Sequence, residues 1–220
     1  QYWTPGNFDE KYEGSITLRT ALEKSRNLVS AEIVSKIGVE PVIRTARKVG
    51  IESPIGKHLS ISLGSSEVTL LELARAYGVF AAKGLLFNSI FITKITDRTG
   101  KVIYDYGADR LNSAHQAVPD TSAFVMANMM RGVIDRGTAT VVKPIGRPVA
   151  GKTGTSNDCM DAWFIGYTPE WVSGVWIGFD QKKEIGKKET GGKIAAPIWL
   201  AFMKQYLEEQ DKKKYSKLVE

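Results

Sequence analysis

The most constraining feature of this 220-residue chain is the segment 149–180, in which a short polar motif precedes two apolar runs. The motif reads Val-Ala-Gly-Lys-Thr-Gly-Thr at 149–155. The runs read Asp-Ala-Trp-Phe-Ile-Gly-Tyr at 161–167 and Trp-Val-Ser-Gly-Val-Trp-Ile-Gly-Phe at 171–179. Both are rich in aromatic and β-branched residues, and Thr-Pro-Glu separates them, which is typical of a β-hairpin. We therefore predict a three-stranded meander whose first strand is the motif.

The motif itself suits the binding of an anion at a strand edge. Side chains alternate along a strand, so Thr153 and Thr155 share one face, and Lys152 and Gly154 take the other face or the edge. Lys152 supplies a positive charge with rotatable donors. Glycines at 151 and 154 allow a ligand or another backbone to come close. The pattern Lys-Thr-Gly alone is a weak signal, and by itself it favours a strand end with a solvated lysine.

The remaining sequence predicts an α+β fold in one domain, with an antiparallel sheet flanked by helices and an α-rich lobe. Residues 1–85 are assigned mostly to the α lobe, and 86–220 mostly to the sheet and its flanking helices. Helices are predicted at Leu18–Lys24 behind a Thr17 cap, at Leu28–Ile37, at Val42–Val49 and at Ala195–Leu207. Two more helices are predicted, one from the Thr69–Glu72 capping box toward Gly84 and one after an Asp120 cap, with an apolar face through Phe124, Met126, Met130 and Val133. Strands are predicted at Ser89–Asp97 and Lys101–Tyr106.

Composition excludes several classes of function. The net charge is +6, but basic residues do not alternate with aromatic ones, so nucleic acid is not an expected partner. Lysines cluster at 181–188 and 211–217, which we interpret as a solvated loop and a frayed tail; attraction to anionic lipids or polymers is the alternative. There is no apolar run long enough to span a membrane. The single cysteine and the isolated His58 and His115 imply neither a disulfide framework nor a metal site, and no cofactor is expected.

Several motifs together resemble one known family. The segments 14–27, 63–77, 137–139, 151–180 and 191–197 resemble, in this order, the penicillin-binding transpeptidase family, and most closely its bifunctional (class A) peptidoglycan synthases. That family carries Ser-x-x-Lys, Ser-x-Asn and Lys-Thr-Gly motifs. The second is matched by Ser25-Arg26-Asn27, with arginine where the general pattern has aspartate, and the third by Lys152-Thr153-Gly154.

The resemblance implies a role for each matched residue. Ser25 would relay a proton between the lysine of the Ser-x-x-Lys motif and Lys152, which makes both catalytic. Asn27 would hydrogen-bond the amide of the bound peptide. The residues Thr153, Gly154 and Thr155 would bind its terminal carboxylate, and the Thr155 backbone N–H would be an oxyanion-hole donor. From spacing alone, Ser25 and Asn27 also fit simple helix caps.

The nucleophile of that family is absent, because no serine here has lysine three residues later. In the family this motif precedes Ser-x-Asn, so its place would lie before Gln1. We expect the chain to be the C-terminal part of one transpeptidase domain, inactive alone. Its expected partners are an upstream piece of the same protein carrying Ser-x-x-Lys, peptidoglycan stem peptides and β-lactams. The resemblance also implies an upstream glycosyltransferase domain, an N-terminal membrane anchor, and a place on the outer side of the bacterial cytoplasmic membrane.

Two alternatives remain open at this point. A serine β-lactamase or DD-carboxypeptidase shares the motifs but transfers the acyl group to water. A non-catalytic module that binds peptidoglycan or β-lactams would lack the upstream serine altogether.

Overall fold

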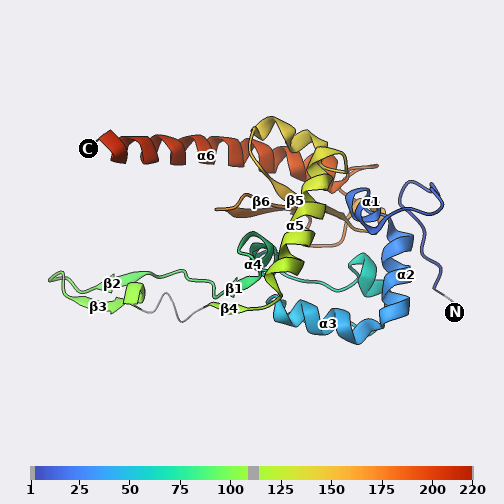
Figure 1. The fold of residues 1–220 in the computed structure, drawn as a ribbon, viewed down its shortest axis with the longest axis horizontal. Coiled ribbons are helices and arrows are strands. Elements are labelled where there is room, and N and C mark those ends of the chain that lie inside the picture. Colours follow the sequence, from blue (N-terminus) through green and yellow to red (C-terminus); the bar gives the residue numbers. More distant parts are fainter. Residues whose placement is uncertain (1–2, 109–113, 220) are drawn as a thin grey trace.

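The computed structural model describes residues 3–108 and 114–219 and has the predicted α+β architecture (Figure 1). Helix α5 runs through the middle of the molecule, and the helical lobe and the main sheet pack on it. The helices are α1 Leu18–Glu23, α2 Asn27–Ile37, α3 Val39–Lys48, α4 Leu70–Ala81, α5 Asp120–Asp135 and α6 Ala196–Val219. The strands are β1 Leu85–Phe87, β2 Lys94–Thr96, β3 Val102–Asp105, β4 Ala114–Gln116, β5 Ala150–Thr155, β6 Asp161–Tyr167 and β7 Val172–Gly178.

The main sheet is the predicted meander, with antiparallel order β5-β6-β7 and the motif on the outer strand β5. Lys152 pairs with Ile165 and Thr155 with Ala162. Asp161 anchors the start of the hairpin, since its Oδ1 accepts a 2.8 Å hydrogen bond from Trp176 Nε1. Within the part of the chain that the structure describes, one edge of the motif strand thus has no neighbouring strand.

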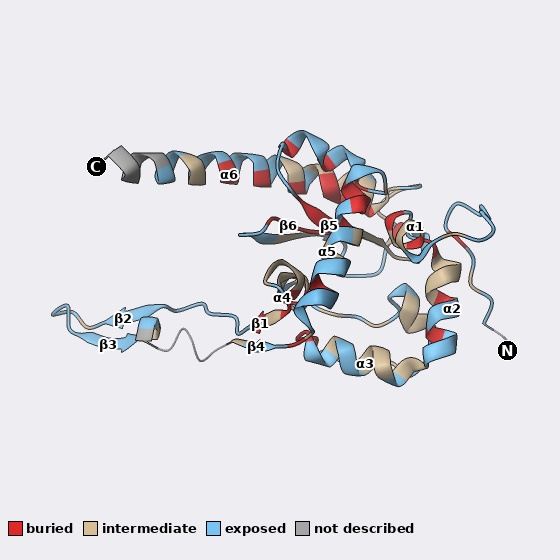
Figure 2. Ribbon diagram, viewed as in Figure 1, coloured by how far each residue is buried: buried red, intermediate tan, exposed pale blue. Residues whose placement is uncertain are grey.

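The sheet is held by an apolar core that α6 covers (Figure 2). Trp199 of α6 is fully buried, packs edge-on against Phe164 of β6 at 5.3 Å, and donates from Nε1 to the Ser173 carbonyl. Burying an aromatic residue and pairing its N–H in this way is the usual arrangement for tryptophan. Trp199 is thus the largest of the buried α6 side chains that hold this helix over the sheet, together with Met203 and Leu207.

The helical lobe has its own core, around Val49, Val79, Leu86 and Ala117. Helix α4 begins with the predicted capping box, in which Thr69 and Glu72 bond each other's backbone amides. Although burial raises a carboxyl pKa, hydrogen bonds from Ser53 and from backbone amides lower the pKa of Glu72 to about 2. The cap thus also ties α4 to the loop before it.

The predicted strands at 89–106 are shorter than expected. Strands β2 and β3 form a two-stranded ribbon that projects from the body, joined by the predicted turn at Asp97 (Figure 1). An isolated ribbon buries little apolar surface, so pairing is confined to the residues near the turn. The pairing of β1 with β4 was not predicted.

Three details of the predicted helices are wrong. Phe124 is 72% exposed, because at about 100° per residue it lies roughly 240° around α5 from the buried Met130. Asp120 is the first residue of α5, and Pro119 holds the cap position. The lysine-rich end continues as helix to Val219, because lysine, glutamate and glutamine are good helix formers once a packed helix precedes them.

In the described residues, no helix has the length and apolarity needed to cross a membrane.

Candidate active site

Ser25 stands at the end of α1 in a backbone conformation that favours glycine, with φ of +55°. Its amide donates to the Leu22 carbonyl and the Arg26 amide donates to the Ala21 carbonyl. These bonds make a Schellman ending with Ser25 at the left-handed position.

The hydroxyl of Ser25 meets the motif strand. Lys152 Nζ donates to Ser25 Oγ at 2.7 Å, although 127 residues separate them. Lys152 also donates to the Thr153 carbonyl at 3.0 Å. Burial disfavours the ammonium form and lowers the pKa of Lys152 to about 8. An amine with this pKa is positioned to exchange a proton with a hydroxyl near neutral pH.

Thr153 and Thr155 project to a second group of contacts, as the predicted alternation requires. The Thr153 hydroxyl lies 2.6 Å from the Thr138 hydroxyl, and Thr155 Oγ1 accepts from the Gly191 amide at 3.1 Å. A side chain at Gly191 would overlap the carbonyl oxygens of Gly154 and Trp163. The Thr153 hydroxyl therefore faces the segment that follows α5, and the Thr155 hydroxyl faces the segment that packs closely on β5 at Gly191.

The Thr155 amide faces the free edge of the sheet. The Ser156 amide donates to the Asp161 carbonyl, toward β6. Successive amides on an antiparallel strand point to opposite sides, so the Thr155 amide points away from β6. Because β5 is the outer strand, this N–H is available to an oxyanion approaching the edge.

Asn27 is the first residue of α2 and follows Ser25 by two residues. Its side chain makes a contact that was not predicted. Its Nδ2 donates to the Gly6 carbonyl at 2.9 Å, so one amide donor is already engaged. Among the described residues, this is the side-chain hydrogen bond that Asn27 makes, and an amide group can form further ones through its second hydrogen and its oxygen. The structure thus brings Ser25 to Lys152 and keeps Asn27 on the same turn.

Sequence reasoning missed two residues around this site. The Thr138 contact with Thr153 was not predicted, although Gly137-Thr-Ala was part of the resemblance. Glu23 is buried beside Ser25 and takes a double hydrogen bond from Arg136, at 2.6 and 2.8 Å. An acidic residue at a helix C-terminus opposes the helix dipole, so its place at the end of α1 was the available signal.

The fold and this site define a class of protein. The model of the penicillin binding protein transpeptidase domain matches residues 1–204. The chain therefore belongs to the penicillin-binding protein transpeptidase domain family.

The similar proteins confirm the resemblance to class A enzymes. The chain is 41% identical over 202 residues to penicillin-binding protein 1A of Aquifex aeolicus and 42% identical over 207 residues to that of Neisseria gonorrhoeae. These alignments cover 92% of the chain but only 27% and 26% of those proteins.

Solved structures agree with the fold. Penicillin-binding protein 1A of Haemophilus influenzae has a TM-score of 0.87 at 26% identity, covering 93% of this chain and 36% of that one. PonA1 of Mycobacterium tuberculosis, solved in complex with penicillin V, has a TM-score of 0.80 at 25% identity, covering 92% and 59%.

Proposed function

We propose that this chain supplies two of the three active-site motifs of a peptidoglycan DD-transpeptidase. The nucleophilic serine and its lysine lie on an upstream segment of the same protein, which also carries any glycosyltransferase domain and membrane anchor, at the outer side of the bacterial cytoplasmic membrane. The observation that carries this proposal is the 2.7 Å contact between Lys152 Nζ and Ser25 Oγ.

The geometry supports an acyl transfer in two steps. The upstream serine attacks the penultimate D-alanine carbonyl, and its proton passes through Ser25 to the amine of the departing D-alanine. The Thr155 N–H stabilises the oxyanion, while the hydroxyls of Thr153 and Thr155 hold the terminal carboxylate. An amine of a second stem peptide then attacks the acyl-enzyme, frees the serine, and forms the crosslink. A β-lactam acylates the same serine.

Lys152 acts in its protonated form in this scheme. The ammonium donates to Ser25 Oγ and lowers the free energy of the substrate carboxylate and the oxyanion. With a pKa of about 8 it loses its proton as the pH rises above neutrality. The second-order rate constant for acylation reports ionisations of the free enzyme, so it is expected to fall through about pH 8.

The test is intact mass and peptide mapping of the full-length protein after exposure to benzylpenicillin. One penicilloyl adduct is expected, on a serine outside residues 1–220. Lys152→Ala is expected to slow its formation by roughly 10²-fold or more. Lys101→Ala is the control, because it also replaces a lysine by alanine but at the turn of the projecting ribbon. It is expected to leave the acylation rate within about twofold of the wild type.

Other outcomes contradict the proposal. An adduct on a serine within the chain would show that the motif assignment is wrong. Binding of penicillin without any adduct would favour the non-catalytic module. Release of the penicilloyl group within minutes would favour a β-lactamase or carboxypeptidase.

A further inference from the structure

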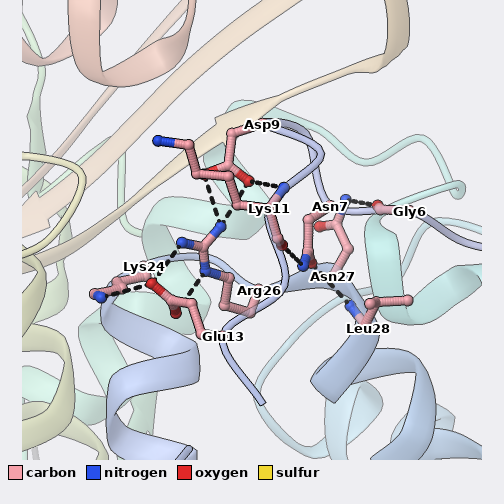
Figure 3. Close-up of polar contacts among 9 residues, drawn as sticks. All are labelled: Gly6, Asn7, Asp9, Lys11, Glu13, Lys24, Arg26, Asn27 and Leu28. Atoms are coloured by element: carbon pink, nitrogen blue, oxygen red, sulfur yellow. Dashed lines mark hydrogen bonds and ion pairs between the residues drawn. The ribbon is translucent and has the colours of Figure 1, made fainter.

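Arg26, the middle residue of the Ser-x-Asn motif, is buried against an acidic segment that precedes α1 (Figure 3). Its Nη1 donates to Asp9 Oδ1 at 2.7 Å and to Oδ2 at 2.9 Å. Its Nε and Nη2 donate to Glu13 at 3.1 and 3.0 Å. The guanidinium therefore joins two carboxylates at once, which the compact ammonium of lysine matches poorly.

The residues on both sides of Ser25 are tied to the same segment, Gly6–Glu13, which we call the lead segment (Figure 3). Lys24 forms an ion pair with Glu13 at 2.8 Å, and Asn27 Nδ2 donates to the Gly6 carbonyl at 2.9 Å. Asn7 accepts from the Leu28 amide at 3.3 Å, an amide in the first turn of α2. The hydroxyl of Ser25 bonds Lys152 instead.

These contacts form a network rather than isolated surface pairs. Hydrogen bonds from the Arg26 side chain lower the pKa of Asp9, and those from Lys24 and then Arg26 lower the pKa of Glu13. The Arg26 side chain is only 10% exposed, which strengthens its charge-assisted hydrogen bonds. A network of this kind holds a conformation more firmly than single exposed ion pairs do.

The turn at Ser25 needs such a support. A non-glycine residue at positive φ costs about 1–2 kcal/mol and persists only where the surroundings over-determine it. Lys24, Arg26, Asn27 and Leu28 flank Ser25 and are all held by the lead segment. The support therefore acts on both sides of the strained residue.

We infer that Arg26 is a positioning residue, clamped by Asp9 and Glu13, which holds the Ser25 hydroxyl against Lys152. The inference rests on the proposed function of that hydroxyl. Arg26 acts through the turn and takes no part in proton transfer itself.

The experiment is a double-mutant cycle on the second-order rate constant for acylation of the full-length protein by benzylpenicillin. Arg26→Gln is expected to lower the rate about 10- to 100-fold, as displacement of a group in the site does. In a Ser25→Ala background the same substitution is expected to cost less than about twofold, because the hydroxyl it positions is gone. Arg26→Lys keeps the positive charge but not the planar guanidinium, so its acylation rate is expected to lie between those of the wild type and Arg26→Gln.

The pH profile separates positioning from mere loss of folded protein. When Ser25 leaves Lys152 and water enters, the alkaline limb near pH 8 is expected to move up toward the value of an ordinary lysine. A variant that only unfolds in part would lower the amplitude and leave the limb in place. Arg75→Gln is the matched control, since Arg75 is also partly buried and paired with Glu52, but on α4.

The inference is overturned if Arg26→Gln has no effect, or if it costs the same factor in both backgrounds with an unmoved limb. Should Arg26→Gln fail to fold, Asp9→Asn and Glu13→Gln each remove one side of the clamp and enter the same cycle. A harmless Ser25→Ala, or a wild-type protein that is not acylated, would instead overturn the proposed function.

Discussion

Ser25 occupies a position that helices usually give to glycine. Its φ of +55° follows from the Schellman ending of α1, whose hydrogen bonds are both made. Glycine would relieve the strain but would remove the hydroxyl that lies 2.7 Å from Lys152. A local stability cost is thus retained at the position whose hydroxyl has the proposed role in acylation.

Substitution of Ser25 separates this strain from the chemistry. Ser25→Ala and Ser25→Gly both remove the hydroxyl, so both are expected to slow acylation to a similar degree. The glycine variant is expected to be more stable than the alanine variant by roughly 1 kcal/mol, because only alanine keeps the steric cost of positive φ.

Chemical denaturation of the complete transpeptidase domain measures the difference. Equal stability of the two variants would mean that the turn is not strained. A glycine variant with wild-type acylation would show that the hydroxyl has no role.

Among the elements, the motif strand β5 is in tight contact with a helical turn that is distant in sequence. The helical turn Gly191–Ala195 packs so closely on β5 and β6 that a side chain at Gly191 would overlap backbone oxygens of both. Its amide also donates to Thr155 Oγ1. The direction of the Thr155 hydroxyl therefore depends on a glycine 36 residues away.

Gly191→Ala is therefore expected to push this turn away from β5. The expected cost is about 1–3 kcal/mol of stability, as for other overpacked sites, together with slower acylation. Gly78→Ala is the matched control, because in α4 its Cβ would meet only Val172, at 3.8 Å.

The control is expected to stabilise the protein by up to about 1 kcal/mol through helix propensity. Thermal melting of both variants distinguishes the cases. A Gly191→Ala variant that melts like the control would show that the turn yields without cost.

At the scale of the whole molecule, the candidate site is a joint between the helical lobe and the sheet. Ser25 belongs to the α1–α2 turn and Lys152 to β5, and α5 packs against both α1 and β5. The bond between Glu23 and Arg136 fastens the end of α1 to the end of α5. Gly132 and Gly137 leave the space that Glu23 occupies.

Removing the Arg136 cation tests how much the contact with Glu23 contributes to stability. Arg136→Gln removes the hydrogen-bonded cation from the Glu23 carboxylate, which is 5% exposed, and leaves the longer 4.0 Å ion pair with Arg19. The expected loss of stability is about 1–3 kcal/mol, below the cost for a fully buried pair because Arg136 itself is largely exposed. Acylation is expected to slow as well, since Ser25 follows Glu23 by two residues.

Arg131→Gln, in the same helix, is the control. Its ion pair with Asp135 is exposed on both sides, so a change within about 0.5 kcal/mol is expected by chemical denaturation. If both variants lost the same stability, the contact between Glu23 and Arg136 would contribute no more than an exposed ion pair does.

Features that depend on neighbours along the chain could be predicted from the sequence. The strands β1 and β4 were not predicted, and the two motifs were identified through the family resemblance. The meander and the Thr17 and Thr69 caps follow from periodicity, turn chemistry and short spacings. Each involves contacts a few residues apart or an alternation that one strand already contains.

How those residues work together depends on the packed structure. The clamp on Arg26 and the lowered pKa of Lys152 arise from groups distant in sequence. The left-handed turn at Ser25 is closed by local hydrogen bonds, but serine is not a residue that predicts a positive φ. Burial and desolvation are properties of a packed site, and a sequence pattern contains neither the dielectric environment nor the partner that packing brings.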